Sequence, residues 1–195
     1  MPGEKYVVAA ADNPIQISVR NILNPEGYIF LDNCSDPISL LRLVRSYHPD
    51  FLVADFGIWQ SDARSTLETI DSEMLCAGIL LGDFRDTVIF SMMEQSNAMA
   101  YCPKPVNRDI LLHTVGMANM NYRRVLGLDK KLKEMTENYE SRKLVDRAKA
   151  ILMERDGLNE KDAYERMRKK SMDNRMTLKS VAEMIILQYK TAGKG

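Results

Sequence analysis

The chain has 195 residues, of which 45% are apolar and 28% charged, which is enough for one ordinary domain and a smaller second unit. It contains no run of about 18 apolar residues, and its three cysteines lack CxxC spacing, so we expect a cytoplasmic protein without a membrane span or a disulfide framework. Residues 1–121 hold 8 Lys/Arg against 15 Asp/Glu, whereas residues 122–195 hold 19 against 12. The acidic part suits a metal or phosphoryl site, and the basic part suits a polyanion such as nucleic acid.

Short apolar runs alternate with helix-length periodic segments along the first 120 residues. The strand candidates are residues 6–10, 28–31, 51–54, 78–81 and 98–102. The helix candidates are residues 14–23, 37–47, 63–74, 87–95 and a segment starting at 107, with Asn13 and Asp36 as N-caps ahead of prolines. This order predicts a flavodoxin-like α/β fold with a five-stranded parallel sheet and a site at the carboxyl ends of the strands.

A stripe of apolar residues with alternating spacings of three and four follows this region. It consists of Val125, Leu128, Leu132, Met135 and Tyr139. The spacing is that of a heptad repeat on a long helix, which either packs within the chain or forms a parallel coiled-coil dimer. We favour the dimer, because neither flanking unit offers the stripe an obvious cover. We therefore expect a domain at residues 1–121, a coiled-coil linker helix at 122–140 and a C-terminal domain at 141–195.

The last 55 residues are predicted to form three helices. The first covers about residues 141–155 and ends near Gly157, a residue suited to the left-handed position after a helix. Asn159 has the position of an N-cap for the second helix. Residues 174–177 form the next break, and the third helix begins at about Leu178.

Three charged residues follow three of the predicted strands. Asp12 follows the first strand, Asp55 the third and Lys104 the fifth. In a parallel sheet these strand ends converge, so we expect the three side chains to lie close together. Two carboxylates can hold Mg²⁺, one of them can accept a phosphoryl group, and the lysine can neutralise the added charge.

Two segments around these residues resemble response-regulator receiver domains of two-component systems. The segment PDFLVAD ends in Asp55, and AYCPKP contains Lys104 in the register of the family's lysine–proline signature. The resemblance implies that Asp55 is the phosphoacceptor, that Asp12 and Asp55 bind Mg²⁺ with a backbone carbonyl of Gly57, and that Lys104 contacts the phosphoryl group. It also implies a sensor histidine kinase as a partner.

The sequence departs from the receiver pattern at three positions. Ala11 stands where the family usually has a second acid, Gly82 where it usually has Thr or Ser, and Trp59 where it often has Pro. Gly82 has no hydroxyl to follow a phosphoryl group. Two interpretations therefore stay open, namely a receiver phosphorylated at Asp55 and a degenerate receiver that acts as a ligand- or protein-sensing scaffold.

A set of residues in the C-terminal part resembles the ANTAR module, named for the AmiR and NasR transcription antitermination regulators. The set comprises the segment RAKAILM at 147–153, Gly157, Ala163, Tyr164, Met167, Arg168, Arg175, Leu178, Val181 and Ala182. Ala150 replaces the family's Gly and Ser171 its Ala, and both are small-for-small replacements. The two resemblances cover nearly the whole chain in the order that such regulators use.

The ANTAR resemblance implies a regulator that binds RNA stem-loops in leader transcripts and prevents a terminator hairpin from forming. Two stem-loops require two modules, which agrees with the expected homodimer, and no enzyme activity is expected. The candidate RNA-binding residues are Lys149, Arg168, Lys169, Arg175 and Lys179. Tyr164 either stacks on a base or lies in the core. A DNA-binding response regulator is the alternative, although we find no obvious recognition helix.

Overall fold

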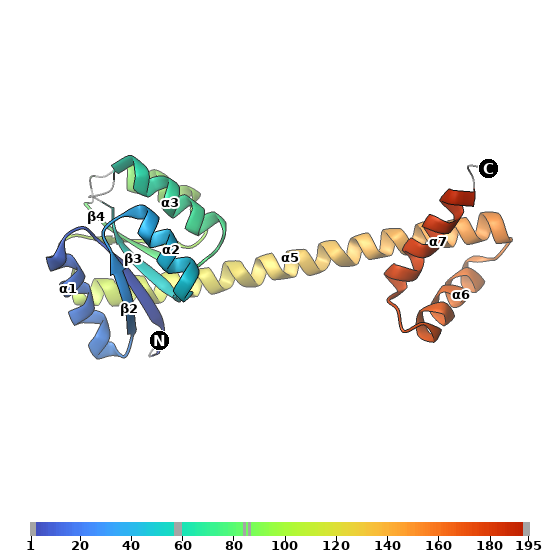
Figure 1. The fold of residues 1–195 in the computed structure, drawn as a ribbon, viewed down its shortest axis with the longest axis horizontal. Coiled ribbons are helices and arrows are strands. Elements are labelled where there is room, and N and C mark those ends of the chain that lie inside the picture. Colours follow the sequence, from blue (N-terminus) through green and yellow to red (C-terminus); the bar gives the residue numbers. More distant parts are fainter. Residues whose placement is uncertain (1–2, 57–59, 84, 86, 193–195) are drawn as a thin grey trace. The chain divides into compact units, whose positions relative to one another are not determined.

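The structure is a computed structural model that describes residues 3–56, 60–83, 85 and 87–192 (Figure 1). The chain divides into two compact units, Met1–Leu128 and Asp129–Gly195. The first unit contains a sheet with helices, and the second contains helices alone. None of the helices built from the described residues combines the length and the apolar character that crossing a lipid bilayer requires.

Five parallel strands form the sheet of the first unit in the order β2-β1-β3-β4-β5. Their bounds are β1 Lys5–Ala9, β2 Ile29–Cys34, β3 Phe51–Asp55, β4 Ala77–Gly82 and β5 Met99–Pro103. Every residue of β3 and β4 is buried, as expected for strands covered on both faces. The predicted five-stranded parallel sheet is therefore confirmed.

Helices cover both faces of this sheet (Figure 1). They are α1 Asn13–Leu23, the short 3-10 helix η1 Asn24–Glu26, α2 Pro37–Tyr47, α3 Gln60–Ser72, α4 Thr87–Gln95 and the beginning of α5 Arg108–Asp156. One core joins β-strand residues such as Leu52 to α2, α3 and α4, and the other joins residues such as Val53 to α1 and α5. Because alternate residues of a strand point to opposite faces, each buried strand contributes to both cores.

Two of the predicted helix starts differ in outcome. Asp36 caps α2 as predicted, because its carboxylate accepts a hydrogen bond from the backbone N–H of Ser39 at 2.8 Å. The prediction for Asn13 is wrong by one residue, since α1 begins at Asn13 and its N-cap is Asp12. The Asp12 side chain makes no capping hydrogen bond, so its carboxylate is not committed to the helix.

Helix α5 has 49 residues and contributes to both units. It contains the last helix of the sheet unit, the apolar stripe and the first of the three predicted C-terminal helices without interruption. The predicted domain boundaries at residues 121 and 140 both fall inside it. The helix continues through both boundaries because no proline or helix-ending motif lies between residues 121 and 140.

The second unit packs the end of α5 against α6 Glu160–Asp173 and α7 Leu178–Ala192. Its core includes Ala148, Met167 and Val181, one from each helix. Asp156, the last residue of α5, accepts hydrogen bonds from Arg166 of α6 at 2.5 Å and from Tyr189 of α7 at 2.7 Å. The predicted three C-terminal helices are confirmed, as is the Asn159 cap, which accepts from the N–H of Asp162.

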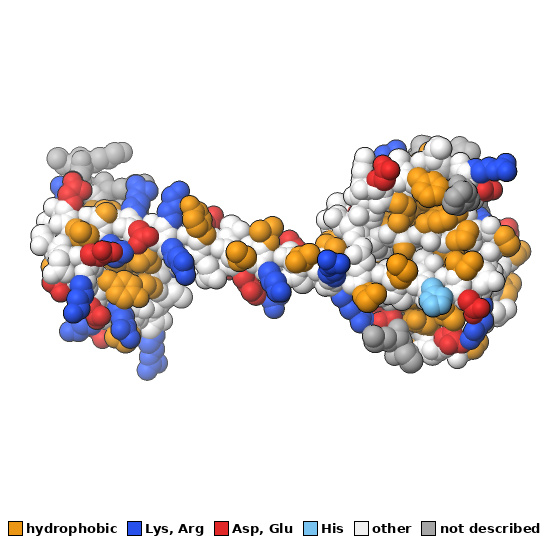
Figure 2. Space-filling model, turned by 180° about the vertical axis from the view of Figure 1, so that it is seen from behind, with side chains coloured by type: hydrophobic (Ala, Val, Ile, Leu, Met, Phe, Trp, Pro, Cys, Tyr) orange, Lys and Arg blue, Asp and Glu red, His pale blue; other side chains and the backbone are white. Residues whose placement is uncertain are grey.

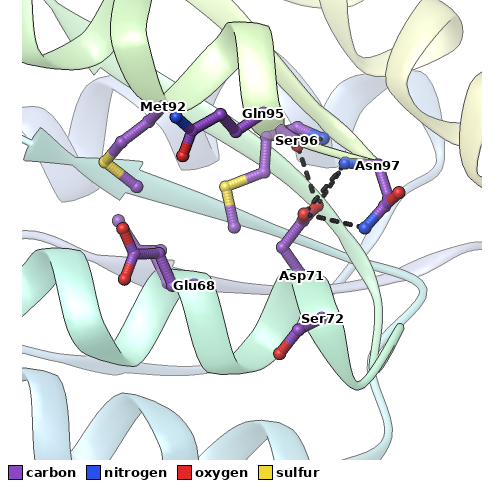
Figure 3. Close-up of a pocket in the computed structure, with 9 residues that line it drawn as sticks. Glu68, Asp71, Ser72, Met92, Gln95, Ser96 and Asn97 are labelled. Atoms are coloured by element: carbon purple, nitrogen blue, oxygen red, sulfur yellow. Dashed lines mark hydrogen bonds between the residues drawn. The ribbon is translucent and has the colours of Figure 1, made fainter.

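Asp71, near the end of α3, forms hydrogen bonds with the turn between α4 and β5 (Figure 3). Its buried carboxylate accepts hydrogen bonds from the hydroxyl of Ser96 and from the backbone N–H groups of Asn97 and Ala98 at 2.8–3.1 Å. Glu68 and Gln95 lie beside it around a small cavity of about 180 Å³. Since these bonds satisfy nearby donors, we assign Asp71 a structural role in positioning β5.

All three cysteines are buried and free. Burial raises the pKa of Cys34 and of Cys76 to about 12, and it raises the pKa of Cys102 as well. These thiols therefore stay protonated near neutral pH and behave as small apolar core residues.

Candidate functional site

Asp55 and Lys104 lie together at the carboxyl edge of the sheet. Asp55 ends β3, where it pairs with Leu81 of β4, and Lys104 directly follows β5. The Asp55 side chain is fully buried, and its carboxylate forms an ion pair with the ammonium group of Lys104, whose side chain is 30% exposed. The expected convergence of these two residues is therefore present, and it brings a buried carboxylate next to a cation.

Asp12 lies beyond the end of β1, the strand next to β3. Ala9 of β1 pairs with Ala54 of β3, so Asp12 and Asp55 both lie at the carboxyl edge of the sheet. The Asp12 side chain is exposed. Among the described residues, no three His, Cys, Asp or Glu side chains gather as a metal site. Asp12 and Asp55 can still supply two carboxylates, a number that suits Mg²⁺, because this ion commonly keeps several waters. Gly57, the predicted carbonyl ligand, and Trp59 lie outside the described residues.

Gln16 fixes the backbone beside Asp12, a role that was not predicted from the sequence. Its side chain is buried, donates a 2.6 Å hydrogen bond to the carbonyl of Ala10 and accepts one of 2.6 Å from Asn33 of β2. The detectable signal was a polar residue on the buried face of α1, at helical spacing from Val19 and Leu23. Gln16 thus positions the loop that carries Ala11 and Asp12.

Gly82 ends β4, and a side chain at this position would require the end of the Ile89 side chain to move. A Cβ atom at this position would lie 2.0 Å from Cδ1 of Ile89 in α4, a fully buried residue. The Gly82 carbonyl accepts hydrogen bonds from the backbone N–H of Lys104 at 2.9 Å and from the hydroxyl of Tyr101 at 3.2 Å. The ring of Tyr101 also contacts Phe90, with centroids 5.6 Å apart. Ile89 and Tyr101 therefore occupy the place next to Gly82.

Four of the five predicted RNA-binding residues lie around the connection between α6 and α7. Arg168 and Lys169 are exposed on α6, Arg175 is exposed in the connection, and Lys179 is half-buried at the start of α7. Figure 2 shows Lys and Arg side chains spread over the visible face of this unit, around hydrophobic side chains. We call Arg168, Lys169, Arg175 and Lys179 the basic surface.

Lys149, the fifth predicted residue, is held by two carboxylates within the same unit. Its ammonium group lies 2.9 Å from Asp146 and 2.8 Å from Glu160, and its side chain is 17% exposed. The hydrogen bond to Glu160 and then that to Asp146 raise the pKa of Lys149 above its usual value. Lys149 is therefore charged, but part of its charge is already compensated.

Tyr164 lies outside the core of the second unit. Ala163 and Met167, which lie one and three residues away on α6, are fully buried, whereas the Tyr164 side chain is 41% exposed. The core interpretation of Tyr164 therefore fails, and its ring is accessible for stacking.

The stripe on α5 is exposed within one chain. Leu128, Leu132, Met135 and Tyr139 are between 57% and 70% exposed, and Val125 is half-buried. Four large apolar side chains on one face of a helix, without cover from their own chain, are consistent with a helix that pairs with another.

Comparisons with known proteins identify relatives of both units. Residues 133–186 match the ANTAR domain family. The chain is 26% identical over 182 residues to Transcriptional regulatory protein PdtaR from Mycobacterium tuberculosis, covering 93% of this chain and 89% of that protein.

Several solved structures that resemble the chain are receiver domains. One is the signal receiver domain of a modulated diguanylate cyclase from Desulfovibrio desulfuricans, with a TM-score of 0.55 and 19% identity over 62% of this chain and 97% of that chain. Another is a response regulator receiver domain protein from Methanospirillum hungatei, with a TM-score of 0.52 and 17% identity over 63% and 98%. At these identities the likeness shows the fold alone. The chain therefore joins a domain of the receiver fold to an ANTAR domain.

Proposed function

We propose that this protein is a transcription antitermination regulator that binds RNA stem-loops in leader transcripts through its C-terminal unit. The observation that carries the proposal is that the ANTAR match, residues 133–186, contains all five candidate RNA-binding residues within one three-helix unit. The similarity to a transcriptional regulatory protein over 93% of the chain supports the same role. Its activity is then binding, and it needs no catalytic turnover.

The basic surface is suited to phosphate groups. Arginine and lysine that neutralise phosphates release counterions, so binding should weaken steeply as salt rises. Arg168 and Arg175 also present planar guanidinium groups, which can stack on unpaired bases in an RNA loop. Because such cations bind the phosphates of any nucleic acid, the choice of RNA loops over duplex DNA rests on the ANTAR match.

The receiver-fold domain is proposed to accept a phosphoryl group from a sensor histidine kinase at Asp55. A carboxylate oxygen of Asp55 would attack the phosphorus of the donor, and the leaving group would depart with its bonding electrons. Lys104, which already contacts this carboxylate, would then pair with a phosphoryl oxygen. Asp12 and Asp55 would hold Mg²⁺, which supplies positive charge that stabilises the transferring group.

The stripe on α5 is proposed to pair two chains as a parallel coiled coil. Dimerisation would cover Leu128, Leu132, Met135 and Tyr139, which one chain leaves exposed. Two chains would present two ANTAR domains, and this number matches a target with two neighbouring stem-loops. A dimer also raises the effective concentration of the second module once the first has bound.

The test begins with capture of the transcripts crosslinked to the protein in cells, followed by sequencing. We expect pairs of stem-loops ahead of a terminator. The captured stem-loop RNA is then used in a shift assay at fixed salt with Arg168→Ala, Arg175→Gly and the control Lys130→Ala, which removes an exposed charge of α5 outside the basic surface.

Arg175→Gly best separates the loss of a charge from a loss of stability. Arg175 has a φ of 51°, a left-handed conformation that glycine adopts without a Cβ penalty. The substitution therefore removes a cation while preserving or raising stability. We expect Arg168→Ala and Arg175→Gly each to weaken RNA binding about fivefold to a hundredfold, and Lys130→Ala to have little effect. Unchanged affinity in both variants, or tighter binding to duplex DNA of the same sequence, would contradict the proposed RNA-binding role.

A further inference from the structure

A pocket of about 310 Å³ lies in the second unit, on the side of α5 that faces α6 and the start of α7. Its lining includes Arg142, Val145, Asp146 and Lys149 of α5, Tyr164 of α6 and Leu178 of α7. The volume is at the low end of small-molecule sites, which span about 300–1,000 Å³. It therefore suits one small planar group better than an extended ligand.

The pocket opens next to the basic surface. Leu178 directly precedes Lys179 in α7, and Arg168 follows Tyr164 by four residues, which places the two on the same face of α6. A nucleic acid strand whose phosphates contact Arg168 and Lys179 would thus pass the mouth of the pocket. Arg142 adds an exposed guanidinium group at the rim.

The walls of the pocket combine an aromatic ring with aliphatic side chains. Tyr164 is 41% exposed, whereas Tyr189, the other tyrosine of the C-terminal helices, packs against the core and donates its hydroxyl to Asp156. The half-exposed ring of Tyr164 can therefore stack on a planar partner. Val145 and Leu178 supply the apolar surface that would contact the edge of that partner.

Asp146 is unexpected in a site next to phosphate-binding residues, because a carboxylate repels phosphate. Lys149 compensates its charge in part from 2.9 Å away, and a carboxylate has further capacity to accept hydrogen bonds. The N–H groups on the edge of a nucleobase are donors that a carboxylate accepts, as in Asp or Glu contacts to cytosine. The acid is thus explained by a base in the pocket and not by the phosphate backbone.

We propose that this pocket binds one unpaired nucleobase of the RNA loop, with Tyr164 stacked on its face and Asp146 accepting from N–H groups on its edge. This inference rests on the proposed RNA-binding function and specifies how the loop is recognised. Lys149, held between Asp146 and Glu160, orients Asp146, and the Asp146 carboxylate disfavours a base that presents only acceptors there. The pocket thus reads a base, whereas the basic surface binds the strand.

The test is an in vitro selection with the full-length chain and a pool of stem-loop RNAs whose loops are fully randomised. The variants are Tyr164→Leu, Tyr164→Phe and Asp146→Asn, and the control is Tyr47→Leu, the same substitution at an exposed tyrosine of α2, outside both the pocket and the stripe. Affinity for the RNA selected by the wild type is then measured over a range of salt concentrations.

We expect the wild type to enrich one base with N–H donors at a single loop position. Tyr164→Leu should lose about tenfold in affinity, within the contribution of base–aromatic stacking, without a change in the salt dependence, which counts phosphate contacts. Tyr164→Phe should bind like the wild type, and Asp146→Asn should change the enriched base. Tyr47→Leu should leave both properties unchanged.

Two other results would contradict the base pocket alone or the RNA-binding function as a whole. If Tyr164→Leu and Asp146→Asn select the same loops with wild-type affinity, the base pocket is wrong, while salt-dependent RNA binding through the basic surface stands. If the wild type enriches no RNA at all, the proposed RNA-binding function fails, and the pocket proposal fails with it.

Discussion

Ile89 of α4 fills the space beside Gly82, so that a Cβ atom on Gly82 would lie 2.0 Å from its Cδ1 atom. Both residues are buried in the receiver-fold domain, and the contact cannot be relieved by rotation into solvent. A larger residue at position 82 therefore requires the end of the Ile89 side chain to move within the core.

We accordingly predict that Gly82→Thr destabilises the protein by about 1–3 kcal/mol, the usual cost of overpacking a core. Adding Ile89→Ala should recover part of this loss, although Ile89→Ala alone is destabilising because it leaves a cavity. Denaturant unfolding of the four proteins in the double-mutant cycle measures the coupling. Additive effects of the two substitutions would show that the contact is not constraining.

Phosphorylation at Asp55 is expected to change RNA affinity only weakly. The position of Gly82 offers no hydroxyl that could move toward a phosphoryl group, and Ile89 occupies the neighbouring space. A modification with little differential contact between two states shifts their balance only slightly. RNA binding with and without beryllofluoride and Mg²⁺ should differ by less than about tenfold, or roughly 1.4 kcal/mol. A hundredfold gain that disappears in Asp55→Asn would instead indicate an ordinary phosphorylation switch.

Asp71→Ala should destabilise the receiver-fold domain by about 2 kcal/mol or more, because it leaves buried donors without their charged acceptor. The affected donors are the hydroxyl of Ser96 and the N–H groups of Asn97 and Ala98. Glu68→Ala, on the rim of the same cavity, is the control and should have little effect. Thermal unfolding compares the two variants, and equal melting temperatures would remove the structural role given to Asp71.

The three cysteines should resist alkylation in the folded protein at pH 8. Burial raises the pKa of Cys34 and of Cys76 to about 12, so the reactive thiolate fraction at this pH is lower than for an exposed thiol. Raising the pH toward 9 increases the thiolate fraction of Cys34 and Cys76, but this fraction stays small because the pH remains far below their pKa of about 12. Mass spectrometry after iodoacetamide treatment, with and without urea, checks this. Rapid labelling without urea would show that the thiols are accessible.

Replacing Leu132 and Met135 by Asp should convert the expected dimer into monomers, because unpaired charges would be buried in the helix seam. Lys130→Asp and Lys133→Asp introduce the same acids away from the stripe and should leave the dimer intact. Sedimentation of the two double variants at equal concentration distinguishes the cases. A wild type that is monomeric at tens of micromolar with RNA present would contradict the coiled coil.

The sequence was most informative where local periodicity or a strand end determines the outcome. Alternating apolar runs located all five strands, and the convergence of parallel strand ends correctly predicted that Asp55 lies near Lys104. The start of α1 was misplaced by one residue, since both Asp12 and Asn13 are good N-cap residues.

Features that depend on contacts between elements were not predictable in the same way. The fit of Ile89 against Gly82 depends on how α4 packs on the sheet, which no spacing in the sequence encodes. The ion pair between Lys149 and Glu160 depends on the turn that brings α6 back toward α5. The exposure of Tyr164 was equally unpredictable from the sequence. A tyrosine close to two buried positions on a helix can lie either in the core or on the surface.

The uninterrupted α5 has a consequence for how such proteins are assembled in evolution. Leu111 and Val115 of this helix belong to a core of the sheet unit, and Ala148 and Leu152 belong to the core of the C-terminal unit. Gene fusion cannot join the two units through a tolerant surface loop, because no loop separates them. A recombination event must instead splice helix to helix, so that the junction itself has to remain helical and cannot introduce a proline. New pairings of these units are thus restricted to junctions that continue the helix.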